Sequence, residues 1–214
     1  MKRGIVALTA LTAAGIAAGN VSAAKPGSGQ LTVAASKAQV TYSRSAVVGG
    51  QLKRSPAAGQ QLQLEQAPYP FNKFTTAATA TTDGSGNYSF TVTPTSSTHY
   101  RVVTVAKPKL TSAEAQVNVA IKVTRRVSDK TPARGQRVRF SGLTAPALAG
   151  RAVTIERRAA DGSWKTAATT TLDAQSNYAK RLRIRRSGTY RATVAGTDPA
   201  LLTGHSSTIR LRVH

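Results

Sequence analysis

The residues of this chain best suited to chemistry are arginines that take every second position of two segments. They are Arg137, Arg139, Arg181, Arg183 and Arg185. The residues between them are apolar. A guanidinium is always charged and binds phosphate or carboxylate oxygens through a planar fork of N–H groups. Because side chains two positions apart on a strand share a face, the pattern predicts an anion-binding surface over an apolar layer.

Acid and base side chains for catalysis are scarce. The chain has eight Asp and Glu residues and three His residues. It has no Gly-x-Ser-x-Gly, no His-Glu-x-x-His, no phosphate-binding glycine loop and no histidine spacing typical of a metal site. We therefore expect no enzyme activity, no cofactor and no metal. A hydrolase stays as a minor alternative, because a Ser-His-Asp site is recognised by geometry and not by sequence order.

Two loops carry oxygen donors at alternating positions. They are Asp83, Ser85 and Asn87 in one loop and Asp173, Gln175 and Asn177 in the other. Alternating oxygens around glycine begin a calcium loop, but such a loop also needs further carboxylates, which neither segment supplies nearby. We therefore favour hairpin turns, in which Asp caps backbone amides and Gly or Asn adopts a positive φ.

The chain repeats itself at a spacing of 90 residues. Matched pairs are Phe74 with Trp164, Asp83 with Asp173, Asn87 with Asn177, Tyr88 with Tyr178, and Tyr100 with Tyr190. Such a unit is longer than the ~20 to 50 residues of a solenoid repeat, so each copy must bury a core of its own. This predicts two tandem domains, over residues 37–120 and 121–214.

Apolar and polar residues alternate at period two through both copies, as at Leu62 and Leu64. Turns rich in Gly, Asn and Asp separate these runs. In the second copy we expect seven strands, near residues 121–127, 136–142, 152–158, 164–172, 177–185, 189–195 and 208–213. This indicates an all-β fold of two sandwiches. The alternation continues from Val117 to Val123 without Gly or Pro, which predicts a stiff junction.

The second copy carries a series of turn and core motifs. They are Phe140-Ser141-Gly142, Ala149-Gly150-Arg151-Ala152-Val153, Asp161-Gly162-Ser163-Trp164, Asn177-Tyr178 and Gly188-Thr189-Tyr190-Arg191. With them it resembles the bacterial immunoglobulin-like repeat domains of secreted and surface proteins. The first copy is similar, with Phe74 in place of the Trp. The resemblance implies two tandem immunoglobulin-like Greek-key β-sandwich domains of about seven strands each, with binding, spacer or adhesive roles.

The aromatic residues that match between the copies could form a stacking platform for bases or sugars, but we expect them to lie in the cores. Tyr100 and Tyr190 stand at the start of the sixth expected strand, where a sandwich tyrosine ties its hydroxyl to the backbone at a corner. Tyr69 and Phe71 lie in a Pro-flanked segment without a counterpart in the second copy. These two residues are therefore candidate contact residues.

Charge divides unevenly between the copies. Lys and Arg outnumber Asp and Glu by 19 to 5 over residues 121–214 but by 9 to 3 over residues 24–120. In an immunoglobulin-like order the second and fifth strands are neighbours, so the five arginines should share one sheet face. Like charges directly opposite cost a few tenths to ~1 kcal/mol per pair, which a bound anion would offset.

The alternative explanation of this charge is a general basic bias combined with protection of sheet edges. Against it, the matching strand of the first copy carries Ser89 and Thr91 outward instead of arginine. A general basic bias should raise the positive charge of both copies.

The N-terminal segment predicts export. Lys2 and Arg3 precede a short apolar stretch, and Val21-Ser22-Ala23 supplies the small residues that a signal peptidase needs. We expect a signal peptide over residues 1–23, a flexible lead-in over residues 24–36, and a secreted, extracellular protein; an uncleaved anchor is the minor alternative. Export without cysteine favours a bacterial source.

These observations together indicate a secreted, non-catalytic binding module. Its expected ligand is an anionic polymer, either of the cell envelope or an extracellular nucleic acid, held by the arginine-rich face of the second domain. A protein partner on the cell surface is a further alternative as the ligand. The alternative is a structural or adhesive spacer without a strong ligand of its own.

Overall fold

The structure is a computed structural model and describes residues 30–214, in which every regular element is a strand. The first half contains β1 (Ala34–Ala35), β2 (Gln39–Thr41), β3 (Ala46–Gln51), β4 (Gln61–Pro68), β5 (Thr75–Thr81), β6 (Asn87–Val92), β7 (Thr98–Thr104) and β8 (Ala115–Ala120). The second half contains β9 (Lys122–Val123), β10 (Arg126–Val127), β11 (Arg137–Ala145), β12 (Ala152–Arg158), β13 (Trp164–Thr171), β14 (Asn177–Arg183), β15 (Gly188–Val194), β16 (Gly204–His205) and β17 (Ile209–Leu211). The expected signal peptide lies outside the described residues.

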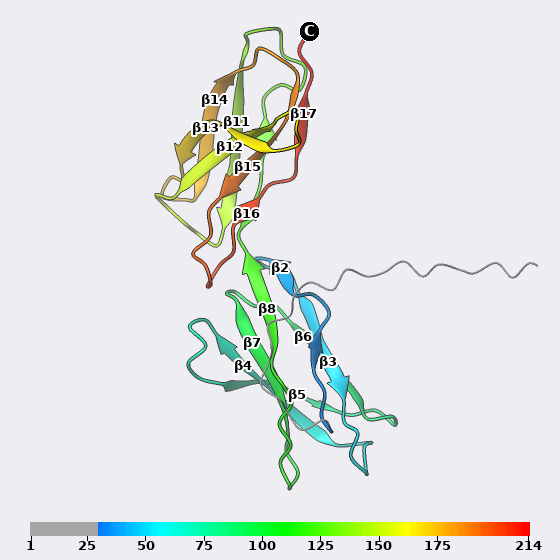
Figure 1. Ribbon diagram of the computed structural model, residues 1–214. Coiled ribbons are helices and arrows are strands. Elements are labelled where there is room, and N and C mark those ends of the chain that lie inside the picture. Colours follow the sequence, from blue (N-terminus) through cyan, green and yellow to red (C-terminus); the bar gives the residue numbers. More distant parts are fainter. Residues whose placement is uncertain (1–29) are drawn as a thin grey trace, which may run out of the picture.

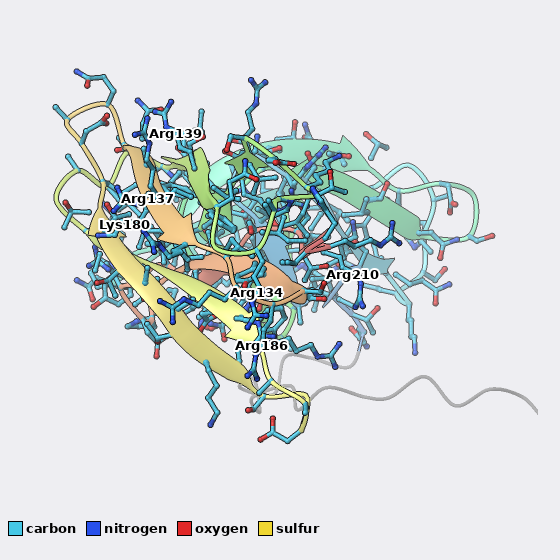
Figure 2. All side chains as sticks on the ribbon, turned by 90° about the horizontal axis from the view of Figure 1, so that it is seen from above. Arg134, Arg137, Arg139, Lys180, Arg186 and Arg210 are labelled. Atoms are coloured by element: carbon cyan, nitrogen blue, oxygen red, sulfur yellow. The ribbon has the colours of Figure 1, made fainter. Side chains whose placement is uncertain are left out.

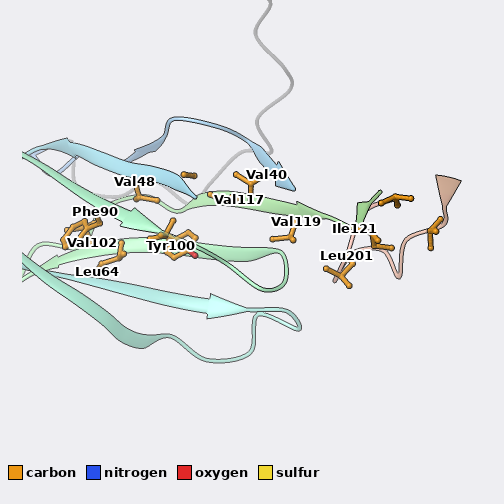
Figure 3. Packing of buried hydrophobic residues seen from close by; sticks show 14 of the residues in the cluster. Val40, Val48, Leu64, Phe90, Tyr100, Val102, Val117, Val119, Ile121 and Leu201 are labelled. Carbon is orange, nitrogen blue, oxygen red and sulfur yellow. The ribbon is translucent and has the colours of Figure 1, made fainter. Parts of the chain in front are cut away.

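The first sandwich packs the three-stranded sheet β1-β3-β6 against the five-stranded sheet β2-β8-β7-β4-β5 (Figure 1). Inward side chains of both sheets, such as Val48, Leu64 and Tyr100, are buried (Figure 3). They meet because alternate side chains of a strand point to the same face, so each period-two run supplies one apolar layer.

The first sandwich begins earlier in the chain than the sequence predicts. The expected flexible lead-in over residues 24–36 is wrong at its end, because Leu31 is buried and bridges to Leu52, and β1 pairs with β3. This short strand covers the edge of its sheet, a role that a Gly- and Ser-rich context does not reveal. Residues 24–29 lie outside the described residues.

The second sandwich pairs the sheet β10-β11-β14, with β9 also on β11, against the sheet β13-β12-β15-β16, with β17 also on β15. The consecutive strands β11 and β12 lie in different sheets, because β11 pairs with β14 and β12 pairs with β15. This is the immunoglobulin-like Greek-key arrangement, and the predicted all-β fold of tandem sandwiches is confirmed. The expected first strand is split into β9 and β10, and β16 adds a short pairing before β17.

The repeat extends to an irregularity of the backbone. The β4–β5 ladder shifts register between Leu64 and Glu65, and the β12–β13 ladder shifts between Ile155 and Glu156. A bulge of this kind re-aims the side chain that follows it. In both sandwiches that side chain is a glutamate. It lies opposite an arginine of the strand paired on the other side, β7 in the first sandwich and β15 in the second.

Each of these glutamates holds an arginine against an aromatic ring. In the second sandwich, Arg191 donates from Nε to Glu156 at 2.6 Å, and its guanidinium lies 4.2 Å from the Trp164 ring centroid. In the first, Arg101 stacks in the same way on Phe74, at 4.0 Å. The two rings are half-buried outside the cores, so their predicted core position is wrong. The cation–π contact replaces core packing there.

The tyrosines that tie their hydroxyls to the backbone are Tyr88 and Tyr178. Tyr178 donates to the carbonyl of Thr124 at 2.8 Å, and Tyr88 donates to the carbonyl of Thr32. Burial raises the pKa of Tyr178 to about 12, so its hydroxyl remains a donor at neutral pH. Tyr100 and Tyr190 are buried as expected, but the predicted corner role belongs to this other pair.

The two sandwiches meet end to end through a backbone ladder (Figure 1). Ala120, the last residue of β8, forms a parallel bridge with Leu202 from the β15–β16 loop, and Ser97 N–H donates to the carbonyl of Ala200 at 2.8 Å. Leu201 is buried in the same apolar cluster as Ile121 (Figure 3). The junction is therefore a packed seam.

Candidate functional site

The candidate anion-binding face lies on the sheet of β11 and β14. Arg137 and Arg139 belong to β11, and Arg181 and Arg183 belong to β14. The strand register places Arg137 opposite Arg183 and Arg139 opposite Arg181. All four side chains are exposed, whereas the residues between the members of each pair on a strand are buried. We call these four residues the arginine quartet.

Backbone hydrogen bonds show that the facing arginines form the closer kind of cross-strand pair. Ile184 accepts a hydrogen bond from Gly135 N–H at 2.7 Å and donates one to the Gln136 carbonyl at 2.9 Å. Hydrogen-bonded and non-hydrogen-bonded pairs alternate along an antiparallel ladder, which makes both arginine pairs non-hydrogen-bonded. In such pairs the Cα atoms are only ~4.5 Å apart and the side chains are closest.

The charge of the quartet has no acidic partner in the described part of the chain. Ion pairs within residues 30–214 are His99–Glu114, Arg101–Glu65 and Arg191–Glu156. No guanidinium of the quartet takes part in these pairs or donates a hydrogen bond over the same residues. Like charges opposite one another are destabilising by up to ~1 kcal/mol per pair before solvent screening. An external anion would relieve this repulsion.

Arg185, the fifth predicted site residue, lies apart from the facing pairs. β14 ends at Arg183, so Arg185 extends the row by one step without an arginine opposite it. Sequence reasoning missed Lys180, because alternation assigns that position to the core, yet its side chain is exposed at the edge strand β14. In the view of Figure 2 its label lies near those of Arg137 and Arg139, but the strand register puts Lys180 opposite the buried Phe140, so it does not extend the arginine rows.

The first sandwich carries no charge at the equivalent positions. Its strands β3 and β6 pair as β11 and β14 do, and Thr91 stands where the second sandwich has Arg181. Thr93 stands in the place of Arg183. Ser89 is also outward but matches an alanine, so only Thr91 of the two residues named from the sequence stands in for an arginine. The arginine pairs are therefore specific to one copy of the repeat.

The alternating oxygen donors form turns, as favoured from the sequence. Asp83 Oδ1 accepts hydrogen bonds from the amides of Ser85 at 2.9 Å and Asn87 at 2.8 Å. These bonds, led by the Asn87 amide, hold the pKa of Asp83 below its usual value. Asp173 caps the matching turn through Gln175 and Asn177. The carboxylates thus cap the β5–β6 and β13–β14 turns. Each of these turns joins strands of two different sheets, so the expected hairpins are wrong although the turns are present.

The aromatic loop of the first sandwich forms a small cluster with a histidine. The ring of Phe71 lies 4.2 Å from that of His99, measured between centroids, and Tyr69 meets Phe71 edge-on at 5.5 Å. His99 Nδ1 is 2.8 Å from a carboxylate oxygen of Glu114. Tyr69 is exposed, so this loop keeps a contact surface. The ring of Phe71, however, already packs against both Tyr69 and His99.

Residues 30–214 contain no group of three or more Asp, Glu, His or Cys side chains arranged to hold a metal ion. Over the same residues no helix is long and apolar enough to pass through a membrane.

The sequence matches no protein-family model and no curated protein. Among solved structures, a tetra-tandem repeat from the extending region of a large adhesion protein is similar at 18% identity, with a TM-score of 0.37 and 85% of this chain covered. This chain spans about half of that structure, 48% of its length. The D0-D1 domain of intimin aligns at 14% identity, with a TM-score of 0.32, over 84% of this chain and 97% of its own.

A superoxide reductase (neelaredoxin) from Ignicoccus hospitalis aligns at 12% identity, with a TM-score of 0.34, over 44% of this chain and 83% of its own. Likenesses at these TM-scores carry no conclusion about what the chain binds or does.

Proposed function

We propose that the protein is a secreted, non-catalytic binding module that attaches to an anionic polymer through the arginine quartet of its second sandwich. The observation that carries the proposal is the register of β11 and β14, which sets arginine opposite arginine twice in non-hydrogen-bonded pairs. Folding alone does not favour this placement. A ligand rich in phosphates or carboxylates would turn the repulsion into binding energy, since a guanidinium pairs with such groups in a fork.

The ligand class follows from the shape of the face. Outward side chains recur about every 7 Å along a strand, and the quartet is a flat, two-row lattice of charge. Such a lattice holds successive anionic groups of a chain polymer without reading its sequence. Cell-envelope polymers such as teichoic or uronic acids, and extracellular nucleic acids, share this chemistry.

The test uses duplex DNA as a defined polyanion and measures affinity against salt. If about three to five phosphates are contacted, the logarithm of the affinity falls with log salt at a slope of roughly −3 to −5. Replacing Arg181 and Arg183 with Thr, the residue of the first sandwich, should flatten that slope by about two units. The matched control replaces Arg210 and Arg212 with Thr, removing equal charge elsewhere in the second sandwich.

The control variant should keep nearly the wild-type slope. Equal flattening by both variants would mean that the charge acts diffusely, and the quartet would then not be a site. Parallel measurements with teichoic acid, a polyuronate and single-stranded nucleic acid would rank the natural polymer classes.

Secretion has a test of its own. Export should remove residues 1–23 and leave a mature chain that begins at Ala24. N-terminal sequencing of the secreted protein is the direct measurement. Intact Met1 recovered with the membrane fraction would contradict the signal peptide.

The seam between the sandwiches supports a second candidate function, that of a rigid spacer. Backbone bonds link Leu202 N–H to Val119 O at 2.8 Å and Ile121 N–H to Leu202 O at 3.0 Å, so the two units cannot swing freely while these bonds last. Small-angle scattering tests this role. One extended particle shape at all salt concentrations supports a spacer, and a spread of interdomain angles argues against it.

A further inference from the structure

A groove opens along one side of the second sandwich, between the edge strands β13 and β14. Its volume is about 460 Å³, and its lining includes Ala168 and the buried residues Leu182, Ile184 and Tyr190, which we call its apolar floor. Arginines line its walls, among them Arg157 from β12. An apolar floor between cationic walls favours a ligand that is both apolar and acidic.

The edge of β14 that faces this groove has no strand paired with it among residues 30–214. Ile184, which follows β14, directs its N–H and its carbonyl to the segment before β11. Because these backbone groups alternate in direction along a strand, those of the odd-numbered residues of β14 point away from β11. The carbonyl of Ala179 agrees with this direction, because it accepts a hydrogen bond from Thr170 of β13 at 3.3 Å. Over residues 30–214, β14 pairs with β11 alone. The backbone groups of Arg181 and Arg183 therefore form a free hydrogen-bonding edge.

Arg157 places a positive charge without a counter-ion at this groove. It donates from Nη2 to the carbonyl of Ser187 at 2.9 Å, while its buried Nε finds no hydrogen-bond partner among the described residues. None of the ion pairs within residues 30–214 includes Arg157. A half-buried guanidinium without a counter-ion is costly, and an acidic group entering the groove would neutralise it.

We propose that this groove binds an extended peptide segment of another protein, which adds as a strand to the free edge of β14 and alternates acidic with apolar side chains. Strand addition supplies backbone hydrogen bonds, and pockets for alternate side chains supply selectivity. Side chains of the added strand that point inward meet the apolar floor, and those that point outward lie beside Arg181 and Arg183. The edge therefore selects the alternating pattern.

The charge of the chain argues against a second copy as the occupant. Over residues 121–214, Lys and Arg outnumber Asp and Glu by 19 to 5, so two second sandwiches placed edge to edge would repel each other. The first sandwich provides an internal comparison, because its edge strand β6 carries Thr91 outward and no arginine. An acidic strand should prefer the β14 edge.

The experiment titrates the full chain with synthetic peptides of about ten residues, the upper length of an ordinary strand. The first peptide alternates Glu and Val, the second has the same composition with the residues in blocks, and the third is the alternating peptide N-methylated along one edge. The alternating peptide should bind more tightly than the blocked one. N-methylation should weaken binding by at least about tenfold, since several backbone hydrogen bonds, each worth about two- to tenfold, are lost.

Two protein variants complete the test without relying on the quartet charge alone. Arg181→Ala and Arg181→Pro both lose the guanidinium, but only the proline variant loses the edge N–H. Proline is tolerated where an edge N–H faces outward, and thermal melting checks the fold. The proline variant should bind the alternating peptide at least about twofold more weakly than the alanine variant, whereas both should bind duplex DNA equally.

Equal binding of the alternating and blocked peptides, or indifference to N-methylation, would overturn strand addition. So would a protein that binds duplex DNA and ignores every peptide, an outcome that leaves the polyanion proposal standing. If the proline variant does not fold, the N-methylated peptide on the wild-type chain still decides the question.

Discussion

The side chains of Ser45 and Thr93 share a hydrogen bond of 2.9 Å in the first sandwich, at the place where the second sandwich sets Arg137 opposite Arg183. The two pairs occupy equivalent positions of the repeat, with Ser45 and Thr93 one residue beyond the ends of β3 and β6. One copy of the repeat thus carries a neutral, satisfied pair where the other carries two like charges. This contrast makes the first sandwich a guide to how the second would behave without its charge.

Replacing Arg137 with Ser and Arg183 with Thr should stabilise the second sandwich while weakening its binding to polyanions. The expected gain is a few tenths of a kcal/mol to ~1 kcal/mol, because one like-charge cross-strand pair is removed and a cross-strand hydrogen bond becomes available. Chemical denaturation at low salt measures the gain. It should shrink at high salt, where screening already weakens the repulsion. A loss of stability in this variant would contradict the idea that the pair is kept for binding.

Acid should destabilise the second sandwich in part through Glu156. Burial alone would raise the pKa of this carboxyl, but hydrogen bonds from Thr193 and Arg191 outweigh burial and hold the pKa below its usual value of 4.5. A carboxyl whose pKa is lower when folded contributes stability that is present above pH ~4.5 and is lost as the pH falls through the folded pKa. The variant Glu156→Gln should be less stable at neutral pH and should lose less on acidification. Melting temperatures between pH 7 and 3 measure this difference.

His205 should add a second pH effect at higher pH. Burial, helped by the charge of Arg191, holds the pKa of His205 below its usual value of 6.5. The unfolded chain therefore takes up the proton first, and stability is lost as the pH falls below ~6.5. The variant His205→Gln should remove this slope and leave the one due to Glu156. An unchanged slope between pH 7 and 5.5 would show that His205 does not control it.

The close approach at Gly142 should make this glycine irreplaceable. A Cβ added there would clash with the carbonyl oxygen of Thr124, the same carbonyl that accepts a hydrogen bond from the Tyr178 hydroxyl. Gly142→Ala should therefore cost about 1–3 kcal/mol or more through displaced backbone. Tyr178→Phe, which removes only the hydroxyl, should cost roughly 1 kcal/mol. If the alanine variant proves as stable as wild type, the segment at Thr124 is more pliable than its packing indicates.

The seam should couple the two sandwiches through Leu201. This side chain is buried at the junction, so Leu201→Ala should destabilise the chain by about 2–4 kcal/mol and separate the unfolding of the two sandwiches in calorimetry. The exposed Leu143 serves as control, because Leu143→Ala should change stability by less than about 0.5 kcal/mol. Unfolding that stays concerted in the Leu201 variant would place the coupling in the backbone ladder alone.

Repetition and period-two alternation were enough to predict the sandwiches, because both patterns record which side chains face a core. The alternation at Arg137 and Arg139 also predicted their outward position. The predicted burial was wrong for three residues. Leu31 joins the first core although turn-forming residues surround it, and the aromatic residues Phe74 and Trp164 lie outside the cores, where hydrophobicity alone does not place them.

The all-β class, the tandem repeat and the rows of outward arginine could be derived from the order of residues along the chain, since local periodicity encodes which face of a strand is buried. Folding in three dimensions was needed to show that Arg137 meets Arg183, that Arg157 from the other sheet lines the groove beside β14, and that the β14 edge is free. These relationships join residues from separate strands. Register and sheet packing set them, and neither is written in the spacing of residues along one strand.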